Sequence, residues 1–300
     1  MSYKKGRDHI FFYHGHALAF GGYVERNGGR QMLDGIAPAA LSIAGGSSHA
    51  RSGGYKYPPH ERQTFIGADG KEKLEFFVTV DYAESEVYGS ESGCNYRTVA
   101  RSFLFNLNIN GVVTADEVES VLESTHAMKP GNGEEHARIR TRTDTRESHI
   151  KGLKVRGVPV ETRRFAELDE MATFGELDGF LKRQSLSREQ NELKKSLCAT
   201  SLIGVQPPEP DYVRELASFT SPDLIRCSVL HDLEVPKEHN GGFRVHGYSI
   251  DIDDFGRLFV GELYVSHGTK NLNMLRWDLG CDETGGGTGG SATVNGATMP

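Results

Sequence analysis

The sequence predicts a mainly β protein whose antiparallel strands form a sandwich, a barrel or sheets that turn corners. Several segments alternate apolar and polar residues with a period of two, which is typical of strands with one buried face. The 36 glycines among 300 residues indicate many short turns. Apolar residues (37%) and charged residues (25%) occur as in an ordinary globular protein.

Five segments are predicted as strands from this alternation. The apolar residues expected on a shared buried face are Leu74, Phe76, Val78, Val80 and Tyr82; Val99, Phe103, Phe105, Leu107 and Ile109; Ile225, Cys227, Val229, Leu233 and Val235; Phe259, Leu263 and Val265; and Leu275, Trp277 and Leu279. Phe105 is thus expected in the core, and the substitution Phe105→Asp is expected to unfold the protein.

Three short segments share one pattern: apolar and polar residues alternate up to a glycine, and a second strand-like run follows. The glycines are Gly111, Gly157 and Gly247, which lie 46 and then 90 residues apart. This spacing fits a duplicated unit of about 45 residues. We favour a local bend or bulge at each glycine, because three short matches are thin evidence for a repeat.

One region departs from the β pattern. Between Phe165 and Leu197 apolar residues recur at helical spacing, and sequences typical of capping boxes begin at Thr173 and Ser187. We therefore predict an N-terminal β portion (1–164), a short helical insertion (165–206), a C-terminal β portion (207–284) and a glycine-rich tail (285–300). Three prolines mark the boundary after the insertion: Pro207, Pro208 and Pro210.

The glycine-rich tail is predicted to be flexible by its composition. Such a segment becomes ordered only where it packs on its own chain or on a neighbouring copy. We expect it to lie in a groove or along a sheet edge of a second copy, so that a chain ending at Asp282 folds but assembles less.

Motifs for a cofactor, for catalysis or for a membrane span are not found in the sequence. The cysteines are widely spaced without a C-x-x-C pair, which indicates neither a zinc knuckle nor a disulfide framework; they are Cys94, Cys198, Cys227 and Cys281. The segment from Gly45 to Gly54 lacks a G-x-S-x-G elbow and is interpreted as a Gly/Ser surface loop. The first residues match no signal peptide, so we expect a cytoplasmic protein or one exported without such a signal.

Two histidines form the most suggestive short motif. His14 and His16 are two apart, so on a strand they point the same way and can share a metal ion. The spacing does not single out further ligands for such a site; the candidates are His9, His49, His60 and Glu262. Because two ligands bind metal weakly, we expect no tightly bound metal here.

A basic segment contrasts with the rest of the chain. Residues 136–164 contain nine Lys and Arg against three Asp and Glu, a formal charge of +6 in a chain of net charge −7. The arginines expected on this surface are Arg138, Arg140, Arg142 and Arg146. Aromatic residues do not alternate with them, so stacking of nucleic-acid bases is not indicated.

These observations predict a non-catalytic structural or interaction protein that associates with copies of itself. Contact between the basic segment and an acidic surface of another copy joins unlike surfaces, which generates rings or filaments. One alternative is a metal-binding β-barrel enzyme that uses His14 and His16. A second alternative is a module that binds an anionic ligand or nucleic acid through Arg138, Arg140 and Arg142.

Overall fold

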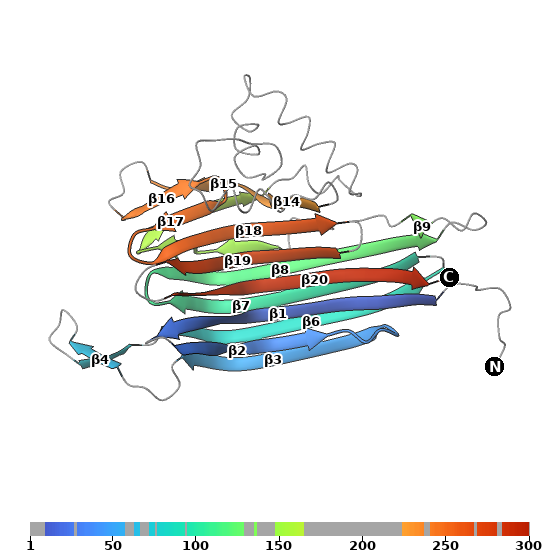
Figure 1. Ribbon diagram of the computed structural model, residues 1–300, viewed down its shortest axis with the longest axis horizontal. Helices are drawn as coiled ribbons and strands as arrows, with labels where there is room; N and C mark the ends of the chain where they lie inside the picture. Colours follow the sequence, from blue (N-terminus) through green and yellow to red (C-terminus); the bar gives the residue numbers. More distant parts are fainter. Residues whose placement is uncertain are drawn as a thin grey trace, which may run out of the picture.

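The computed structural model is an antiparallel β-sandwich made of two large sheets (Figure 1). It describes residues 10–26, 29–57, 63–66, 72–75, 77–93, 95–128, 135–136, 148–164, 224–236, 241–266, 269–280 and 284–299. All described regular elements are strands, which confirms the predicted fold class. The predicted helical insertion lies outside the described residues.

Sheet A consists of seven strands in one path and an eighth strand beside β18. In spatial order they are β16 (Phe243–His246), β17 (Ser249–Ile252), β18 (Gly256–Ser266), β19 (Thr269–Gly280), β20 (Thr284–Met299), β1 (Ile10–Arg26) and β2 (Gly29–Ala40), with β14 (Leu224–Ser228) paired to β18. The predicted N-terminal and C-terminal portions both contribute strands to this sheet.

Sheet B is formed from the first half of the chain. In spatial order its strands are β12 (Val158–Pro159), β11 (Lys154–Val155), β8 (Val113–Met128), β7 (Asn95–Ile109), β6 (Val78–Ser92) and β3 (Gly46–Tyr57), with β10 (His149–Lys151) and β9 (Glu135–His136) paired to β8. Two small ribbons complete the described structure: β4 (Gln63–Ile66) with β5 (Glu72–Glu75), and β13 (Glu161–Arg164) with β15 (Leu230–Glu234).

The two sheets pack face to face, with their long strands running in nearly the same direction (Figure 1). β20 lies over β7 and β8, and β1 lies over β6 and β7. Between the sheets one continuous apolar core forms, and its largest fully buried side chain is that of Trp277. Phe11, Tyr13 and Tyr96 form a second cluster, in which the Phe11 and Tyr96 rings stack 4.3 Å apart.

In sheet A, the side-chain alternation changes phase at one level of the sheet. There the inward-facing residues, elsewhere two apart, are three apart, as from Leu272 to Leu275 and from Val260 to Leu263. Each strand has one extra residue at this level without a change of pairing register, so the strand reverses its faces. These extra residues lie opposite one another and form the bulge row of sheet A: Ala37, Ala19, Gly290, Met274 and Gly261. Three of them have positive φ: Ala37 (50°), Gly290 (65°) and Gly261 (68°).

Sheet B carries a matching bulge row, which consists of Gly54, Asp81, Asn106, Asp116 and Gly152. Asn106 has a φ of 53°, and its side-chain amide donates a hydrogen bond of 2.8 Å to the Asp81 carboxylate. The two rows lie at the same level, because a Cβ atom on Gly290 would contact Val118 and one on Gly289 would contact Leu104.

The phase change corrects two of the strand predictions. Leu107 and Ile109 are buried, but Phe105 lies beyond Asn106 and is 39% exposed on the outer face. Val78 and Val80 face the core, whereas Tyr82 lies outside it. The expectation that Phe105→Asp unfolds the protein assumed that Phe105 lies in the core. This assumption is wrong, because a carboxylate at this position is exposed to solvent.

Other predicted strands differ in their bounds. The segment 74–82 is divided between β5 and β6, and the segment 225–235 is divided between β14 and β15 at Val229. The alternation of Leu275, Trp277 and Leu279 is confirmed, since all three are buried. Residues 46–57 form the edge strand β3, so the prediction of a surface loop there is wrong.

The three glycines of the shared pattern close β-hairpins. Gly111, Gly157 and Gly247 have φ values of 65°, 78° and 59°, and each lies in the turn between two paired strands. Positive φ is what tight hairpin turns require and what glycine adopts without strain. The favoured bend or bulge is thus a full reversal of the chain.

The glycine-rich segment is a central strand of sheet A. β20 pairs with β19 on one side and with β1 on the other along almost its whole length. The indole of Trp277 lies over Gly287, where a Cβ atom would overlap the ring, and stacks on Phe20 at 5.1 Å. The expected docking of this segment onto a second copy is therefore corrected: its partners are strands of its own chain.

We expect Gly287→Ala to lower the free energy of unfolding by about 1–3 kcal/mol, because the new methyl group has to displace the Trp277 ring or the backbone of β1. Gly53→Ala is the matched control, since nothing lies within 4 Å of its Cβ position. Urea unfolding of both variants measures the difference. Equal midpoints for the two variants would contradict this packing of Trp277.

Candidate functional site

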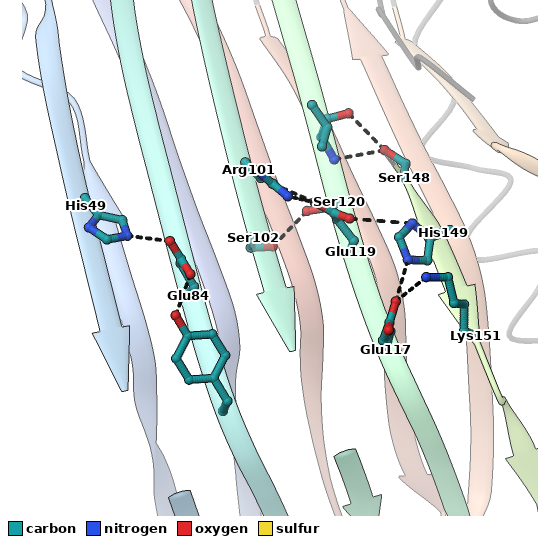
Figure 2. Close-up of polar contacts among 12 residues, drawn as sticks. His49, Glu84, Arg101, Ser102, Glu117, Glu119, Ser120, Ser148, His149 and Lys151 are labelled. Carbon is teal, nitrogen blue, oxygen red and sulfur yellow. Dashed lines mark hydrogen bonds and ion pairs between the residues drawn. The ribbon is translucent and has the colours of Figure 1, made fainter. Parts of the chain in front are cut away.

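The outer face of sheet B carries an ordered network of charged side chains (Figure 2). Its strands alternate in charge from the sheet edge inward: basic on β3, acidic on β6, mixed aromatic and basic on β7, acidic on β8 and basic on β10. The residues are His49 and Arg51; Glu84 and Glu86; Arg101 and Phe103; Glu117 and Glu119; and His149 and Lys151. Opposite charges on neighbouring strands stabilise one another.

Glu84 is the centre of the β3–β6 side of this network. Its carboxylate accepts hydrogen bonds from the Tyr82 hydroxyl (2.5 Å), from His49 Nε2 (2.7 Å) and from Arg51 Nη2 (3.1 Å). These bonds, with that of Tyr82 the largest cause, lower the pKa of Glu84 to about 2. Glu84 therefore stays ionised and fixes the orientation of the Tyr82 ring.

The β7–β8 side is centred on Glu119, whose side chain is almost buried. Arg101 Nε donates to Glu119 Oε1 at 2.6 Å, and His149 Nδ1 lies 3.6 Å from Glu119 Oε2. His149 Nε2 lies 3.2 Å from Glu117, which also binds Lys151. The hydrogen bond from Lys151 is the main cause that lowers the pKa of Glu117. The guanidinium of Arg101 is thus held in place from one side.

Between these two centres the face is hollowed. An open hollow of about 200 Å³ lies over β6 and β7, and its lining residues are Tyr82, Glu84, Ser85, Glu86, Arg101 and Phe103. The Tyr82 and Phe103 rings are 6.4 Å apart and inclined by 57°. Among the described residues the Glu86 carboxylate has no hydrogen-bond or ion-pair partner, although Arg101 lies opposite it on β7. The hollow thus offers a free acceptor, guanidinium donors and two aromatic rings.

The histidine pair lies on the outer face of sheet A. His14 and His16 are exposed on β1, with ring centroids 4.7 Å apart. Burial and then the nearby His14 lower the pKa of His16. No group of three or more potential metal ligands occurs within the part of the chain that the structure describes. Of the further candidates, His49 binds Glu84 and Glu262 binds Arg276, whereas His9 and His60 lie outside the described residues.

A polar cluster lies inside the sandwich. Lys270 Nζ on β19 donates to Ser124 Oγ on β8 at 2.6 Å, and Ser124 Oγ is 2.9 Å from His126 Nε2. Burial, and then Lys270, lower the pKa of His126 to about 4, and burial lowers that of Lys270 to about 7. A hydroxyl beside an amine is an arrangement of nucleophile and base. However, Ser124 is 1% exposed and Lys270 2%, so this pair joins the two sheets rather than facing a substrate.

The residues that line the hollow were not predicted as a site from the sequence, and other residues were predicted instead. Arg138, Arg140, Arg142 and Arg146 lie outside the described residues, so their role stays a prediction. Tyr82 and Phe103 were assigned to the core because a constant period of two places them there. Two signals were available: Asn106, a residue that tolerates positive φ, follows Phe105, and Glu84 and Glu86 share the parity of Tyr82.

The fold and the site define a two-sheet antiparallel β-sandwich with an aromatic-lined hollow on one outer face that carries charges of both signs. The chain belongs to the family described as a domain of unknown function (DUF8256), whose model matches residues 11–266. No curated protein and no solved structure matches the chain. Among the described residues, no helix has the length and apolar character needed to cross a membrane.

We expect the stability of the protein to rise with pH between about 7 and 9 because of Lys270. In the unfolded chain Lys270 regains a pKa near 10.5, so above pH 7 the unfolded state binds more protons and the free energy of unfolding rises, by at most about 1.4 kcal/mol per pH unit. His126, with a folded pKa of about 4, does not titrate in this window.

Urea unfolding at pH 7, 8 and 9 measures this dependence. Lys270→Met should flatten it, whereas Lys151→Met, which removes an exposed amine, should leave it as in the parent. A Lys270→Met variant with the slope of the parent would show that another group is responsible.

Proposed function

We propose that the protein is a non-catalytic interaction protein that binds its partner on the outer face of sheet B, at the hollow between β6 and β7. The observation that carries this proposal is the outward position of Tyr82 and Phe103 beside the carboxylate of Glu86, which has no hydrogen-bond or ion-pair partner among the described residues. Exposed aromatic rings next to a few convergent polar groups are typical of binding sites.

Preorganisation supports this proposal. The Tyr82 hydroxyl is bound to Glu84, and Arg101 is bound to Glu119, so these side chains are oriented before a partner arrives. The residues project from long central strands rather than from loops. A partner therefore binds without the entropic cost of ordering them, which favours affinity.

The outward position of the aromatic rings also exposes apolar surface to water, which is unfavourable. Phe105 is 39% exposed, and Phe103 and Tyr82 are only partly covered. Three aromatic side chains on the solvent face of two neighbouring strands keep apolar area in water that a partner would cover. The outer face of sheet A carries the exposed His14 and His16 on β1.

We expect NMR titrations to locate partner binding at this hollow. The parent would be titrated with oligosaccharides, short peptides, nucleotides and lipid headgroups, and its amide shifts followed. Any class that binds should shift amides of residues 82–86 and 101–105 and should be recovered chemically unchanged. Shifts confined to the face that carries His14 and His16, or turnover of the bound compound, would contradict the proposal.

Self-association is a second candidate function, and the edge strand β3 favours it. β3 is a twelve-residue strand that ends sheet B, and it pairs only with β6 among the described strands. The corresponding edge of sheet A, β2, contains Pro38 and the positive φ of Ala37, which both hinder pairing. Antiparallel pairing of β3 with its copy joins like surfaces and gives a closed dimer.

We expect Gly53→Lys to weaken such a dimer, because it adds a charge to the open edge without a steric clash. Gly53→Ser is the matched control, since it also replaces the glycine but adds no charge. Light scattering over a concentration series should give twice the chain mass of 33.0 kDa for the parent and the control, and the single mass for Gly53→Lys. A parent that stays monomeric at every concentration would end this second candidate.

A further inference from the structure

We infer that the hollow on sheet B binds a neutral carbohydrate, with one sugar ring lying across the Tyr82 and Phe103 rings. This inference rests on the proposed function and names the ligand class for the same site. It is argued from the presence of both positive and negative side chains in the hollow, from its aromatic rings and from its place in the middle of a sheet.

The charges of the hollow select against charged ligands. A cation placed there meets the guanidinium of Arg101, whose side chain is 53% exposed. An anion meets the carboxylates of Glu84, with its pKa of about 2, and of Glu86. Because side chains of both charges line the same small space, a charged ligand is repelled by one of them, whereas a neutral ligand is not.

The polar groups suit hydroxyl groups, which both donate and accept hydrogen bonds. Glu86 supplies a carboxylate that can accept two of them. Arg101 uses Nε and Nη2 for Glu119, so its Nη1 group stays available as a donor among the described contacts. Glu86 and Arg101 lie directly opposite on neighbouring strands, so one ligand edge with vicinal hydroxyls reaches both.

The aromatic rings suit the apolar face of a sugar ring. Tyr82 and Phe103 stand on the same outer face, 6.4 Å apart and inclined by 57°. Their ring faces cover C–H groups of a pyranose, while its hydroxyl edge points to Glu86 and Arg101. The hydrogen bond from Tyr82 to Glu84 holds one ring in this orientation.

The position of the hollow disfavours the other polymers. An extended peptide that adds a strand needs an open sheet edge, but β6 pairs with β3 and β7, and β7 pairs with β6 and β8. A nucleic acid needs an excess of positive charge, whereas Arg51 and Arg101 are paired with Glu84 and Glu119, and Glu86 adds a further negative charge. A volume of about 200 Å³ fits a single ring, and the affinity for one ring should be on the order of 1 mM.

The test is an NMR titration of the full chain with four neutral hexasaccharides: cellohexaose, maltohexaose, xylohexaose and chitohexaose. At least one of them should shift the amides of residues 84–86 and 101–103. The affinity should change less than about twofold between 0.05 and 0.5 M salt, because no net charge is paired. Hexalysine, hexaglutamate and polyphosphate serve as charged probes.

Variants separate the hollow from the rest of the surface. Phe103→Ala should weaken binding at least about tenfold, and Glu86→Gln should weaken it about threefold while it leaves the shape of the hollow intact. Phe12→Ala, which removes a partly exposed ring from the outer face of sheet A, should bind like the parent. A dispersed amide spectrum shows for each variant that it is folded.

Three results would overturn the inference. If no hexasaccharide at about 10 mM shifts these amides but a charged probe does, the ligand class is wrong and the proposed binding face stands. If a hexasaccharide shifts only amides elsewhere, or if Phe103→Ala and Glu86→Gln both bind like the parent, the hollow is not the site and the proposed face falls as well. If none of the probes shifts any amide at that concentration, carbohydrate binding is likewise excluded.

Discussion

The two facing bulge rows are the constraint on which the rest of this sandwich depends. Each strand that crosses this level has one extra residue, which reverses the faces of the strand, while the pairing continues in register from one side of the bulge row to the other. A reversal in one strand alone would put its apolar residues into water next to neighbours that still face the core. All strands therefore change phase together, and the alternating positive φ values of Asn106, Gly152, Gly261 and Gly290 show how the backbone accommodates it.

A second constraint is close packing in the middle of sheet A, and it requires the glycines of strand β20. Trp277 reaches Phe20 on β1 only by crossing the strand that lies between them. Gly287 has no side chain and so leaves room for the indole, whereas any side chain at this position would collide with the indole or with the backbone of β1. The composition that signals a flexible tail in isolation is here a requirement of packing, and propensity gives way to tertiary contacts.

The fold class could be predicted from the sequence because alternation is a local property, visible within one strand. Leu275, Trp277 and Leu279 show it without interruption, and all three are buried. The faces of Phe103 and Phe105 were predicted wrongly, because they depend on the positive φ of Asn106, a single residue that shifts the phase for one half of the strand and that a constant period of two does not take into account. The candidate site was missed for the same reason, because a constant period assigns its two aromatic residues, Tyr82 and Phe103, to the core.

This dependence links the fold to the hollow. Without the extra residue in β6 and β7, Tyr82 would share the inward face of Val78 and Val80, and Phe105 that of Leu107 and Ile109. The reversal brings Tyr82 onto the same outer face as Glu84, Glu86, Arg101 and Phe103. There the Tyr82 hydroxyl donates a hydrogen bond to the Glu84 carboxylate. In exchange, Ala83, Ser85 and Ser102 face the core, and small residues of β1 and β20 such as Ala17 and Ala292 are buried there too. In this half Tyr82, Phe103 and Phe105 are turned outward, whereas Ala83, Ser85 and Ser102 join Leu104 inside. The aromatic surface that we propose for binding is therefore produced by the same backbone feature that sets which residues fill the core.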